Sequence, residues 1–461
     1  MKDGSSRFRD GVGGHGRHRF GSLIVVCMLA DFAVGCAEPE ASSVGSQNSE
    51  PVSETVAALS AAPSRALTAN TQFYIRKPDT EAVTQFVGLL RSRSFGDAAR
   101  LGVMEATPQA VWFTGGSPED VEGAVRTTMR QAAREGRVPV LVAYNIPFRD
   151  CAQFSAGGAL DTASYEAWID GVARGIGDGR AVVIVEPDGL GIIPYNTTIF
   201  GAAEWCMPTV TDAAGNVTPA PGASPSERYA QINYAVDSLE TKATRASVYL
   251  DGTHSAWLGV SEAAYRLFTA GVQRAQGFFV NVSNYETTSD NTQFGTWVSD
   301  CITVATAGAP WAAGHFDWCP SQYDPATNYS TVNYSPDFAA GVTAGLQNLM
   351  GGAAATTRFV IDTSRNGQGH WTPTASYPDP QIWCNPPGRG LGLRPTASTG
   401  VPLLDAYLWI KTPGESDGPC NRGIAGATTD PEWGDTADPA AGAWFPQQAL
   451  QLDSLASPPL L

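Results

Sequence analysis

Short apolar segments alternate with helix-like stretches along most of this chain, and this alternation restricts the fold more than any other feature. The predicted strands cover residues 110–112, 138–143, 182–185, 247–250, 277–280, 359–361 and 406–410. The predicted helices include residues 118–135, 165–175, 226–241, 262–274 and 336–350. Alternation on this scale favours a parallel α/β sheet, and this many units fit one barrel domain of about 390 residues.

An acidic turn follows the most apolar of these segments. Residues 182–185 are predicted to form a fully buried strand, which Glu186, Pro187 and Asp188 bring to an end. Only 16% of the residues are charged, and a carboxylate at the end of a buried strand is costly unless the protein uses it. α/β barrels place their chemistry at the carboxyl ends of their strands. The alternative is structural, because an Asp at this position can cap a helix.

Carboxylates follow other predicted strands in the same way. Asp150 follows strand 138–143, Asp251 follows strand 247–250, and Asp417 comes after strand 406–410. The last two loops also carry the polar or aromatic residues His254, Trp257, Lys411 and Glu415. A single Asp is readily explained as a helix cap, but the repetition makes that explanation much weaker and predicts carboxyl groups crowded in one cleft.

The composition favours a neutral ligand. The net charge is −16 and no basic stripe is present, which argues against nucleic acid or an anionic membrane surface as a partner. The chain has 12 Trp and 14 Tyr residues, and such side chains provide flat surfaces on which sugar rings can stack. Trp is also ordinary core material, so composition alone does not decide between the two uses.

The first 36 residues are predicted to be an export signal. A positively charged start precedes the apolar residues 23–30, which are too short for a stable membrane span. Residues 33–36 end in Cys36 and resemble a bacterial lipoprotein box, although Ala33 stands where Leu is usual and Asp31 interrupts the apolar run. We therefore expect a secreted or cell-surface protein with a lipid anchor at Cys36, or else an ordinary secreted protein. Residues 37–66 are predicted to be a disordered linker, and residues 67–461 a single catalytic domain.

Export also determines how the cysteines are interpreted. Six cysteines remain after the leader, and an even number in an exported protein predicts disulfides. Pairing in chain order would join Cys151 to Cys206, Cys301 to Cys319, and Cys384 to Cys420, which is one of several possible connectivities. Metal-ligand spacings of Cys or His are not found, so no metal site is expected.

Several of these segments together resemble glycoside hydrolase family 6, the cellulases that include cellobiohydrolases and endoglucanases. The matching runs, in family order, are 144–151, 182–190, 249–257, 281–285, 361–367, 383–385 and 411–418. The resemblance implies a distorted, TIM-like parallel β/α barrel with seven strands. It also implies hydrolysis of β-1,4-glucan with inversion at the anomeric carbon, without a cofactor.

The resemblance implies a role for each matching residue. Asp188 would be the general acid, and Asp150 would tune it and relay a proton through water. Asp417 is the competing candidate for the base, Asp251 would set the charge of the cluster, and Tyr144 would lie under the sugar at the cleavage subsite. The implied stacking platforms are Trp112, Trp257 and Trp383, and the implied hydrogen-bonding contacts are His254, Asn284, Lys411 and Glu415.

The family pattern leaves some details open. It supports the disulfides 151–206 and 384–420, whereas 301–319 lies in an insertion and rests on proximity alone. Ala156 stands where the family's cellobiohydrolases tend to have Ser, and Ser155 precedes it. This departure puts the positioning of the attacking water in doubt. No separate carbohydrate-binding module is expected, and we expect a monomer.

Loop lengths bear on the mode of attack. Residues 207–225 and 301–334 are predicted to be long surface loops, and 301–334 and 419–443 look longer than in minimal endoglucanases. Such loops suggest a partly covered site, and hence a cellobiohydrolase or a processive endoglucanase. The alternatives are an open-cleft endoglucanase on soluble or mixed-linkage glucan, and a non-catalytic glucan-binding protein.

Overall fold

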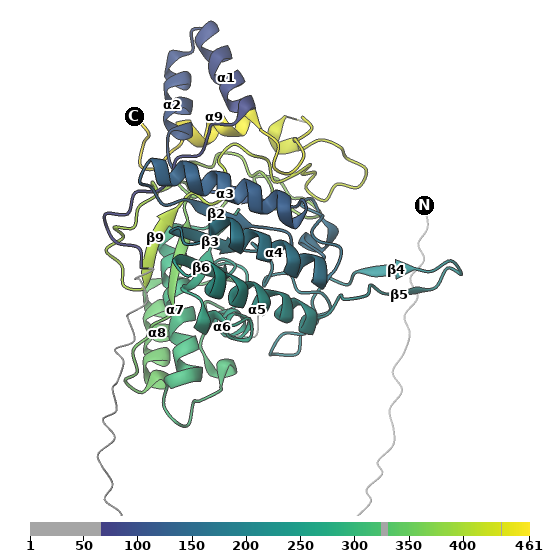
Figure 1. Cartoon of the computed structure of the whole chain (residues 1–461), viewed down its shortest axis with the longest axis vertical. Coiled ribbons are helices and arrows are strands. Elements are labelled where there is room, and N and C mark those ends of the chain that lie inside the picture. Colours follow the sequence, from purple (N-terminus) through teal and green to yellow (C-terminus); the bar gives the residue numbers. More distant parts are fainter. Residues whose placement is uncertain (1–65, 324–330, 435) are drawn as a thin grey trace, which may run out of the picture. The chain divides into compact units, whose positions relative to one another are not determined.

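A parallel β-sheet forms the centre of the structure. The structure is a computed structural model that describes residues 66–323, 331–434 and 436–461. Within these residues seven strands form one sheet in the order β1-β2-β3-β6-β7-β8-β9 (Figure 1). Their bounds are β1 Val111–Phe113, β2 Val140–Ala143, β3 Ala181–Val185, β6 Ala246–Asp251, β7 Gly277–Val280, β8 Arg358–Asp362 and β9 Leu404–Leu408. The predicted strands are all present, although β9 begins and ends two residues earlier than expected.

Alternate residues of the strands pack into two different cores. Val183 and Val185 of β3 belong to the core shared with the covering helices, whereas Val182 and Ile184 pack with inward-facing residues of the other strands. Because both faces are buried, the strands are apolar throughout, as expected for a parallel sheet covered by helices. The inner core fills the space around which the sheet curls.

The curled sheet is not closed by a strand ladder between β1 and β9 in the described residues. Two isolated hydrogen bonds span the gap instead. The Ala110 N–H donates to the carbonyl of Trp409 at 2.9 Å, and the Trp112 indole N–H donates to the carbonyl of Ile410 at 2.8 Å. The prediction of a distorted, seven-stranded barrel is therefore confirmed.

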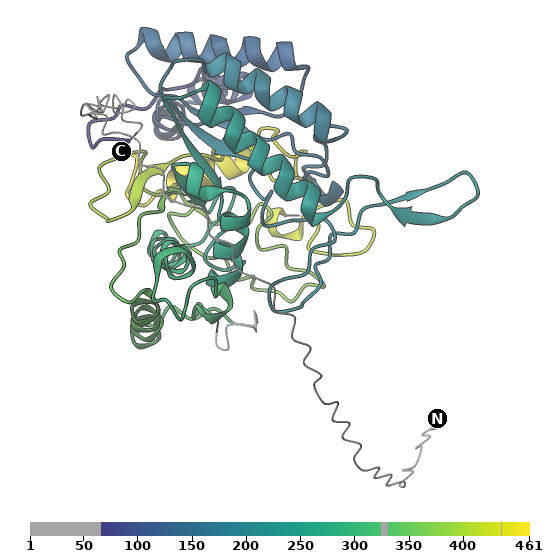
Figure 2. The same cartoon turned by 60° about the horizontal axis from the view of Figure 1, so that its bottom comes forward.

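Helices cover the outer face of the sheet (Figures 1 and 2). They are α3 Pro118–Arg134, α4 Thr162–Ile176, α5 Pro225–Lys242, α6 Val260–Thr269, α7 Thr288–Ala307 and α8 Pro336–Met350. A capping box between Ser117 and Asp120 starts α3. Helices α3 and α4 approach closely because Gly171 faces α3, where a Cβ would lie 2.4 Å from the Pro118 carbonyl oxygen. Helices α1 Thr80–Arg91, α2 Phe95–Glu105 and α9 Pro446–Ser454 pack together beside the barrel.

The structure differs from the sequence-based expectation in several elements. Helices α1, α2, α7 and α9 were not predicted. Residues 207–225, expected to be a loop, contain an exposed hairpin of β4 Thr209–Thr211 and β5 Val217–Pro219. The predicted surface loop 301–334 begins later than expected, because Cys301 is buried within α7. Helix α6 ends early, at the left-handed Gly271 that follows it.

In the described residues, three disulfides join Cys151 to Cys206, Cys301 to Cys319, and Cys384 to Cys420. These are the pairs expected from chain order. In the part of the chain that the structure describes, no helix is both long enough and apolar enough to cross a membrane. The predicted leader, Cys36 and nearly all of the predicted linker lie outside the described residues.

Candidate active site

A cleft of about 770 Å³ opens at the carboxyl ends of the strands. Of the twelve predicted catalytic and substrate-binding residues, eleven line it and only Asp251 does not. Those in the cleft are Trp112, Tyr144, Asp150, Asp188, His254, Trp257, Asn284, Trp383, Lys411, Glu415 and Asp417. The barrel brings these residues together because the carboxyl ends of parallel strands meet at one edge.

The two carboxyl groups of the Glu186-Pro187-Asp188 turn point in different directions. Glu186 is fully buried and accepts hydrogen bonds from the backbone N–H groups of Asn145 and Ile146, at 2.9 and 3.0 Å. Burial raises the pKa of Glu186 to about 7. Asp188 faces the cleft, and turns rather than a helix follow it. The alternative explanation of Asp188 as a helix cap is therefore wrong.

Asp188 is surrounded by negative charge. Burial raises the pKa of its carboxyl group well above the ordinary value, and the charges of Asp251, Asp150 and Asp417 raise it further. The Lys411 ammonium group opposes this rise. A carboxyl group of this kind keeps its proton in the pH range in which an ordinary Asp has lost it.

Asp251 lies beneath the cleft rather than in its wall. Its carboxylate accepts hydrogen bonds from the N–H groups of Leu190 and Gly191, at 3.1 and 3.0 Å, and from Thr253 at 2.9 Å. Asp251 thereby holds the turn that follows Asp188 and places its own charge next to that residue. Burial raises the pKa of Asp251 to about 6.

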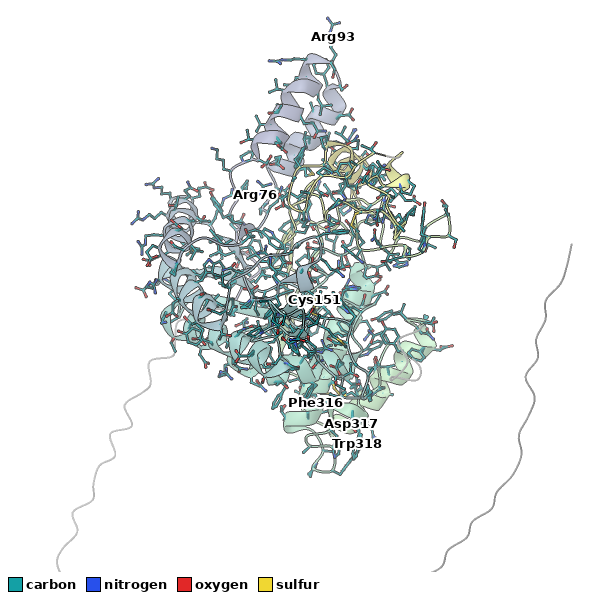
Figure 3. The ribbon with its side chains drawn as sticks, turned by 90° about the vertical axis from the view of Figure 1, so that its right-hand side faces the viewer. Arg76, Arg93, Cys151, Phe316, Asp317 and Trp318 are labelled. Carbon is teal, nitrogen blue, oxygen red and sulfur yellow. A yellow bond between two sulfur atoms is a disulfide. The ribbon has the colours of Figure 1, made fainter. Side chains whose placement is uncertain are left out.

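Asp150 is held in a tightly folded loop. Asp150 and Cys151 have left-handed backbone angles, with φ of 54° and 46°, and Cys151 is tied to Cys206; Figure 3 labels Cys151. The Ser155 N–H donates to the Asp150 carboxylate at 2.8 Å. Burial raises the pKa of Asp150. The Arg149 guanidinium donates to the carbonyls of Tyr144 and Ser155 rather than pairing with a carboxylate.

Asp417 is the most heavily hydrogen-bonded carboxylate of the cleft. Its two oxygens accept from the Arg365 guanidinium at 2.9 and 3.0 Å. The Tyr285 hydroxyl and the Asn385 N–H add hydrogen bonds of 2.9 and 3.0 Å. Arg365 is completely buried and stacks over the Tyr285 ring. Arg365 and Tyr285 lie in two of the family-like segments, but the sequence offered no reason to pair either with Asp417.

Aromatic side chains form flat surfaces in the cleft. The ring of Trp112 meets Tyr144 edge-on at 5.5 Å, and Trp383 lies 5.7 Å from Phe154. Trp257 packs closely against Gly191 in the turn after Asp188. A Cβ atom at Gly191 would lie only 2.5 Å from the Trp257 ring, so a larger residue would not fit there.

Polar groups lie between these rings. Burial lowers the pKa of His254 to about 4, so its ring is neutral, and its Nδ1 accepts from the Ala256 N–H at 3.2 Å. The Lys411 ammonium lies 4.0 Å from a Glu415 oxygen. Burial lowers the pKa of Lys411 and raises that of Glu415.

Some residues of the cleft were not predicted. His370 and Glu286 form a pair at 3.1 Å, which raises the pKa of His370 and lowers that of Glu286. Phe154, Trp205 and Trp371 also line the cleft. Glu286 directly follows the family-like segment 281–285 and could have been found from it. His370 lies in a Gly-rich loop without any periodic signal.

The two long loops contribute differently to the cleft. None of the described residues between 301 and 334 lines it, whereas Ala441 and Gly442 of the segment 419–443 do. The expectation that both segments cover the site is therefore wrong for the described part of the first. That part packs against α6 instead, where the Ser261 hydroxyl donates to the Cys319 carbonyl.

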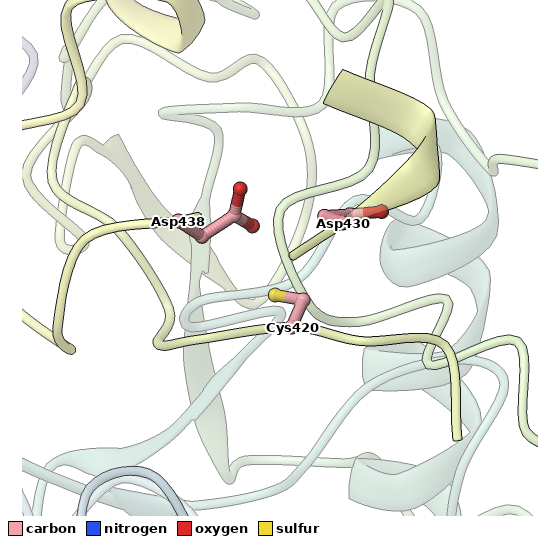
Figure 4. Close-up of side chains that lie close together, drawn as sticks. All are labelled: Cys420, Asp430 and Asp438. Carbon is pink, nitrogen blue, oxygen red and sulfur yellow. The ribbon is translucent and has the colours of Figure 1, made fainter. Parts of the chain in front are cut away.

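Among the described residues, one group of potential metal ligands lies close together. The side chains of Cys420, Asp430 and Asp438 have one ligand atom each within 4.8 Å of one another (Figure 4). The Cys420 sulfur is already bonded to Cys384. Asp430 is paired with the buried Arg422. Neither the sulfur nor this neutralised carboxylate has the character of a free metal ligand.

The amino-acid sequence is similar to those of known glycosyl hydrolases. The pattern of glycosyl hydrolases family 6 matches residues 68–456. Endoglucanase A of Cellulomonas fimi is 31% identical over 373 residues, which are 81% of this chain and 60% of that protein. Endoglucanase 1 of Streptomyces halstedii is 33% identical over 77% of this chain and 82% of its own length. The chain thus spans about 60% of the length of the Cellulomonas protein.

Two solved structures share the fold of this chain. An endoglucanase of Mycobacterium tuberculosis, in complex with methyl-cellobiosyl-4-deoxy-4-thio-β-D-cellobioside, superposes with a TM-score of 0.57. It is 32% identical in sequence, and the match covers 84% of this chain and 98% of that chain. The cellobiohydrolase core domain of Chaetomium thermophilum, with a TM-score of 0.55 and 24% identity, shares the fold.

Proposed function

The chain belongs to glycosyl hydrolases family 6, and on that premise we propose that it is an inverting β-1,4-glucanase of cellulose or a related β-glucan. One observation carries the proposal: Asp188, whose pKa is raised by burial and by the neighbouring carboxylates, shares a cleft with aromatic side chains. Glycoside hydrolysis by inversion needs one protonated and one ionised carboxyl group on opposite sides of the scissile bond. The cello-oligosaccharide analogue bound by the Mycobacterium enzyme supports this substrate class.

Asp188 is the proton donor in this proposal. A glucan chain would lie along the cleft on the rings of Trp112, Trp257 and Trp383. Asp188 protonates the glycosidic oxygen as the bond breaks, and the negative charges nearby stabilise the oxocarbenium-like transition state. The identity of the proton acceptor follows from the partners of the remaining carboxylates.

Asp150 is the better candidate for the base. Both oxygens of Asp417 already accept hydrogen bonds from Arg365, so accepting a further proton would break a buried ion pair. Asp150 has one backbone donor, from Ser155, and its other oxygen is available to a water molecule. We assign Asp150 the role of removing the proton from the attacking water, and Asp417 the role of a fixed negative charge.

An open-cleft endoglucanase is the second candidate for the mode of attack. The position of the described part of 301–334, away from the cleft, favours this candidate over a roofed, cellobiose-releasing enzyme. The segment 419–443, which does reach the cleft, favours partial cover. A purely glucan-binding protein would not need the complete set of carboxyl groups found here.

The product profile tests this function. Carboxymethyl cellulose, mixed-linkage glucan and amorphous cellulose should yield new reducing ends, with the α-anomer appearing first by NMR. An endoglucanase lowers the viscosity of carboxymethyl cellulose early in the reaction. Early β-anomer would contradict the inverting mechanism, and cellobiose release without loss of viscosity would contradict internal attack.

The pH profile should reflect the protonated acid. Activity requires Asp188 to be protonated, so kcat/KM should fall as the pH rises through its raised pKa, and should fall at low pH as the base carboxylate is protonated. Lys411 lowers the pKa of Asp188, so Lys411→Met should move the alkaline limb to higher pH. Lys411→Arg, which keeps the charge, is the matched control. A shift of that limb to lower pH in Lys411→Met would show that another group is the acid.

We also infer that the protein is exported, from the leader predicted for residues 1–36. Mass spectrometry of the mature amino terminus distinguishes a lipid-anchored protein from a simply secreted one. A diacylglycerol-modified Cys36 indicates a lipid anchor, whereas an unmodified terminus indicates simple secretion. A chain that retains residue 1 in the cytoplasm would contradict export.

A further inference from the structure

Exposed aromatic side chains gather on one surface outside the cleft. Tyr265 and Phe268 project from α6, and Trp311 and Trp318 from the insertion that follows α7. Trp311 is 55% exposed and Trp318 is 44% exposed. With His315, they form what we call the aromatic patch. Elsewhere in the described residues, the exposed large aromatic side chains are Phe95 and Trp205, and Trp205 lines the cleft.

The rings of the patch are held in fixed orientations. The His315 imidazole stacks on Trp318 at 3.8 Å with an angle of 11° between the rings. Trp311 lies 6.1 Å from Trp318 at an angle of 31°. The buried ring of Phe316 joins the two halves of the patch, with centroids 5.8 Å from Tyr265 and 5.3 Å from Phe268. Figure 3 shows Phe316, Asp317 and Trp318 side by side at the lower margin of the view.

A disulfide fixes the loop that carries the patch. Trp318 immediately precedes Cys319, which is buried and joined to Cys301 inside α7. The Gly314 N–H donates to the carbonyl of Ala305, which ties the loop to the end of α7. A rigid platform binds with less loss of conformational entropy than a mobile loop. The disulfide therefore restrains a loop whose aromatic rings are exposed and contribute little to the core.

Two segments connect the patch to the loop that carries Trp257 of the cleft. The Tyr323 hydroxyl donates to the carbonyl of Trp257, and the Val260 N–H donates to the Ser321 hydroxyl, so the chain that leaves the patch packs on the cleft loop. Helix α6 begins at Val260, three residues after Trp257, and carries Tyr265 and Phe268. Its 10 residues rise about 15 Å.

We propose that the aromatic patch is a second binding site for the β-glucan chain, outside the catalytic cleft; this proposal rests on the proposed glucanase function. The patch uses the same chemistry as the cleft, in which flat indole rings meet a neutral ligand. The exposed surface of the patch is made of aromatic rings, and the neighbouring Asp317 carboxylate lies 3.3 Å from the His315 imidazole. Sugar rings can stack on such faces while their hydroxyls remain in water.

The size of the patch argues against a second copy of the chain as the occupant. An aromatic side chain buries about 150–250 Å² when fully covered, and those of the patch are already about half buried. Their remaining surface is well below the roughly 800 Å² that each partner contributes to a stable interface. Exposed apolar patches of a few hundred Å² are frequently functional.

The double variant Trp311→Ala/Trp318→Ala tests the proposal in the intact protein. Its affinity for amorphous and microcrystalline cellulose, measured by depletion from solution, should fall about tenfold, because two stacking surfaces for the sugar rings are removed. Its kcat/KM on soluble cello-oligosaccharides should equal that of the unmodified protein, which also shows that it folds. Phe95→Ala, which removes an exposed ring outside the patch, is the matched control and should leave both properties unchanged.

The outcomes separate this proposal from the function on which it rests. Unchanged affinity for cellulose in the double variant, with normal hydrolysis, would overturn the binding site alone. Absence of cello-oligosaccharide hydrolysis by the unmodified protein would overturn the proposed function. A change from dimer to monomer on sedimentation, without a loss of cellulose binding, would identify the patch as a contact between copies and would also overturn the proposal.

Discussion

Asp188→Asn is expected to lower kcat on cello-oligosaccharides by about 10²–10⁴-fold, the contribution typical of general acid catalysis. The amide has the shape of the protonated carboxyl group but cannot give up a proton to the glycosidic oxygen. Because burial and the charges of its neighbours raise the pKa of Asp188 and so favour its neutral form, folding should be almost unaffected. Hydrolysis is measured by the release of reducing ends, and cello-oligosaccharide binding by calorimetry, where the affinity should remain.

Two controls make this result specific. A substrate with a dinitrophenyl leaving group needs little protonation, so Asp188→Asn should retain much more activity on it than on cellotetraose. Glu119→Gln changes an exposed carboxyl group on α3 in the same way and should have no effect. Equal losses on both substrates would show that Asp188 does not act as the acid, and unchanged turnover would refute the assignment outright.

Arg365→Met is expected to lower the free energy of unfolding by about 3–5 kcal/mol, because it leaves the Asp417 carboxylate buried without its partner. Arg365 is completely buried, and its two hydrogen bonds to Asp417 are 2.9 and 3.0 Å long. Activity should fall as well, since Asp417 then loses the partner that holds it in place in the cleft. Unfolding in urea with the disulfides intact, followed by fluorescence and circular dichroism, measures the change.

A double-mutant cycle distinguishes the ion pair from simple loss of packing. Adding Asp417→Asn to Arg365→Met removes the unpaired charge and should restore part of the lost stability. Activity should not return, because the fixed negative charge near Asp188 is gone. If the double variant is less stable than the sum of the single changes predicts, the charge of Asp417 is not what Arg365 stabilises.

Local patterns were sufficient for the strands and for the catalytic carboxyl groups. Residues 182–185 form β3 because a run of β-branched side chains buried on both faces has no stable alternative in a helix-covered sheet. The change from apolar to acidic residues at Glu186 also marks where the strand ends. Helix α7 was missed because its many Thr, Val and Ile residues are poor helix formers in isolation. Burial of Phe294, Trp297 and Val298 against the barrel stabilises it nonetheless.

The sequence by itself determined the parallel β/α barrel and the carboxyl groups at the strand ends, because each of these leaves a signal within a few neighbouring residues. Only the tertiary structure decided that Arg365 neutralises Asp417, that Asp251 supports the turn after Asp188 from below, and that His370 pairs with Glu286. It also decided that the insertion after α7 carries an exposed aromatic patch instead of covering the cleft. Contacts between residues 52 or 84 positions apart leave no periodicity in the chain, since their geometry exists only after the strands have been assembled in order.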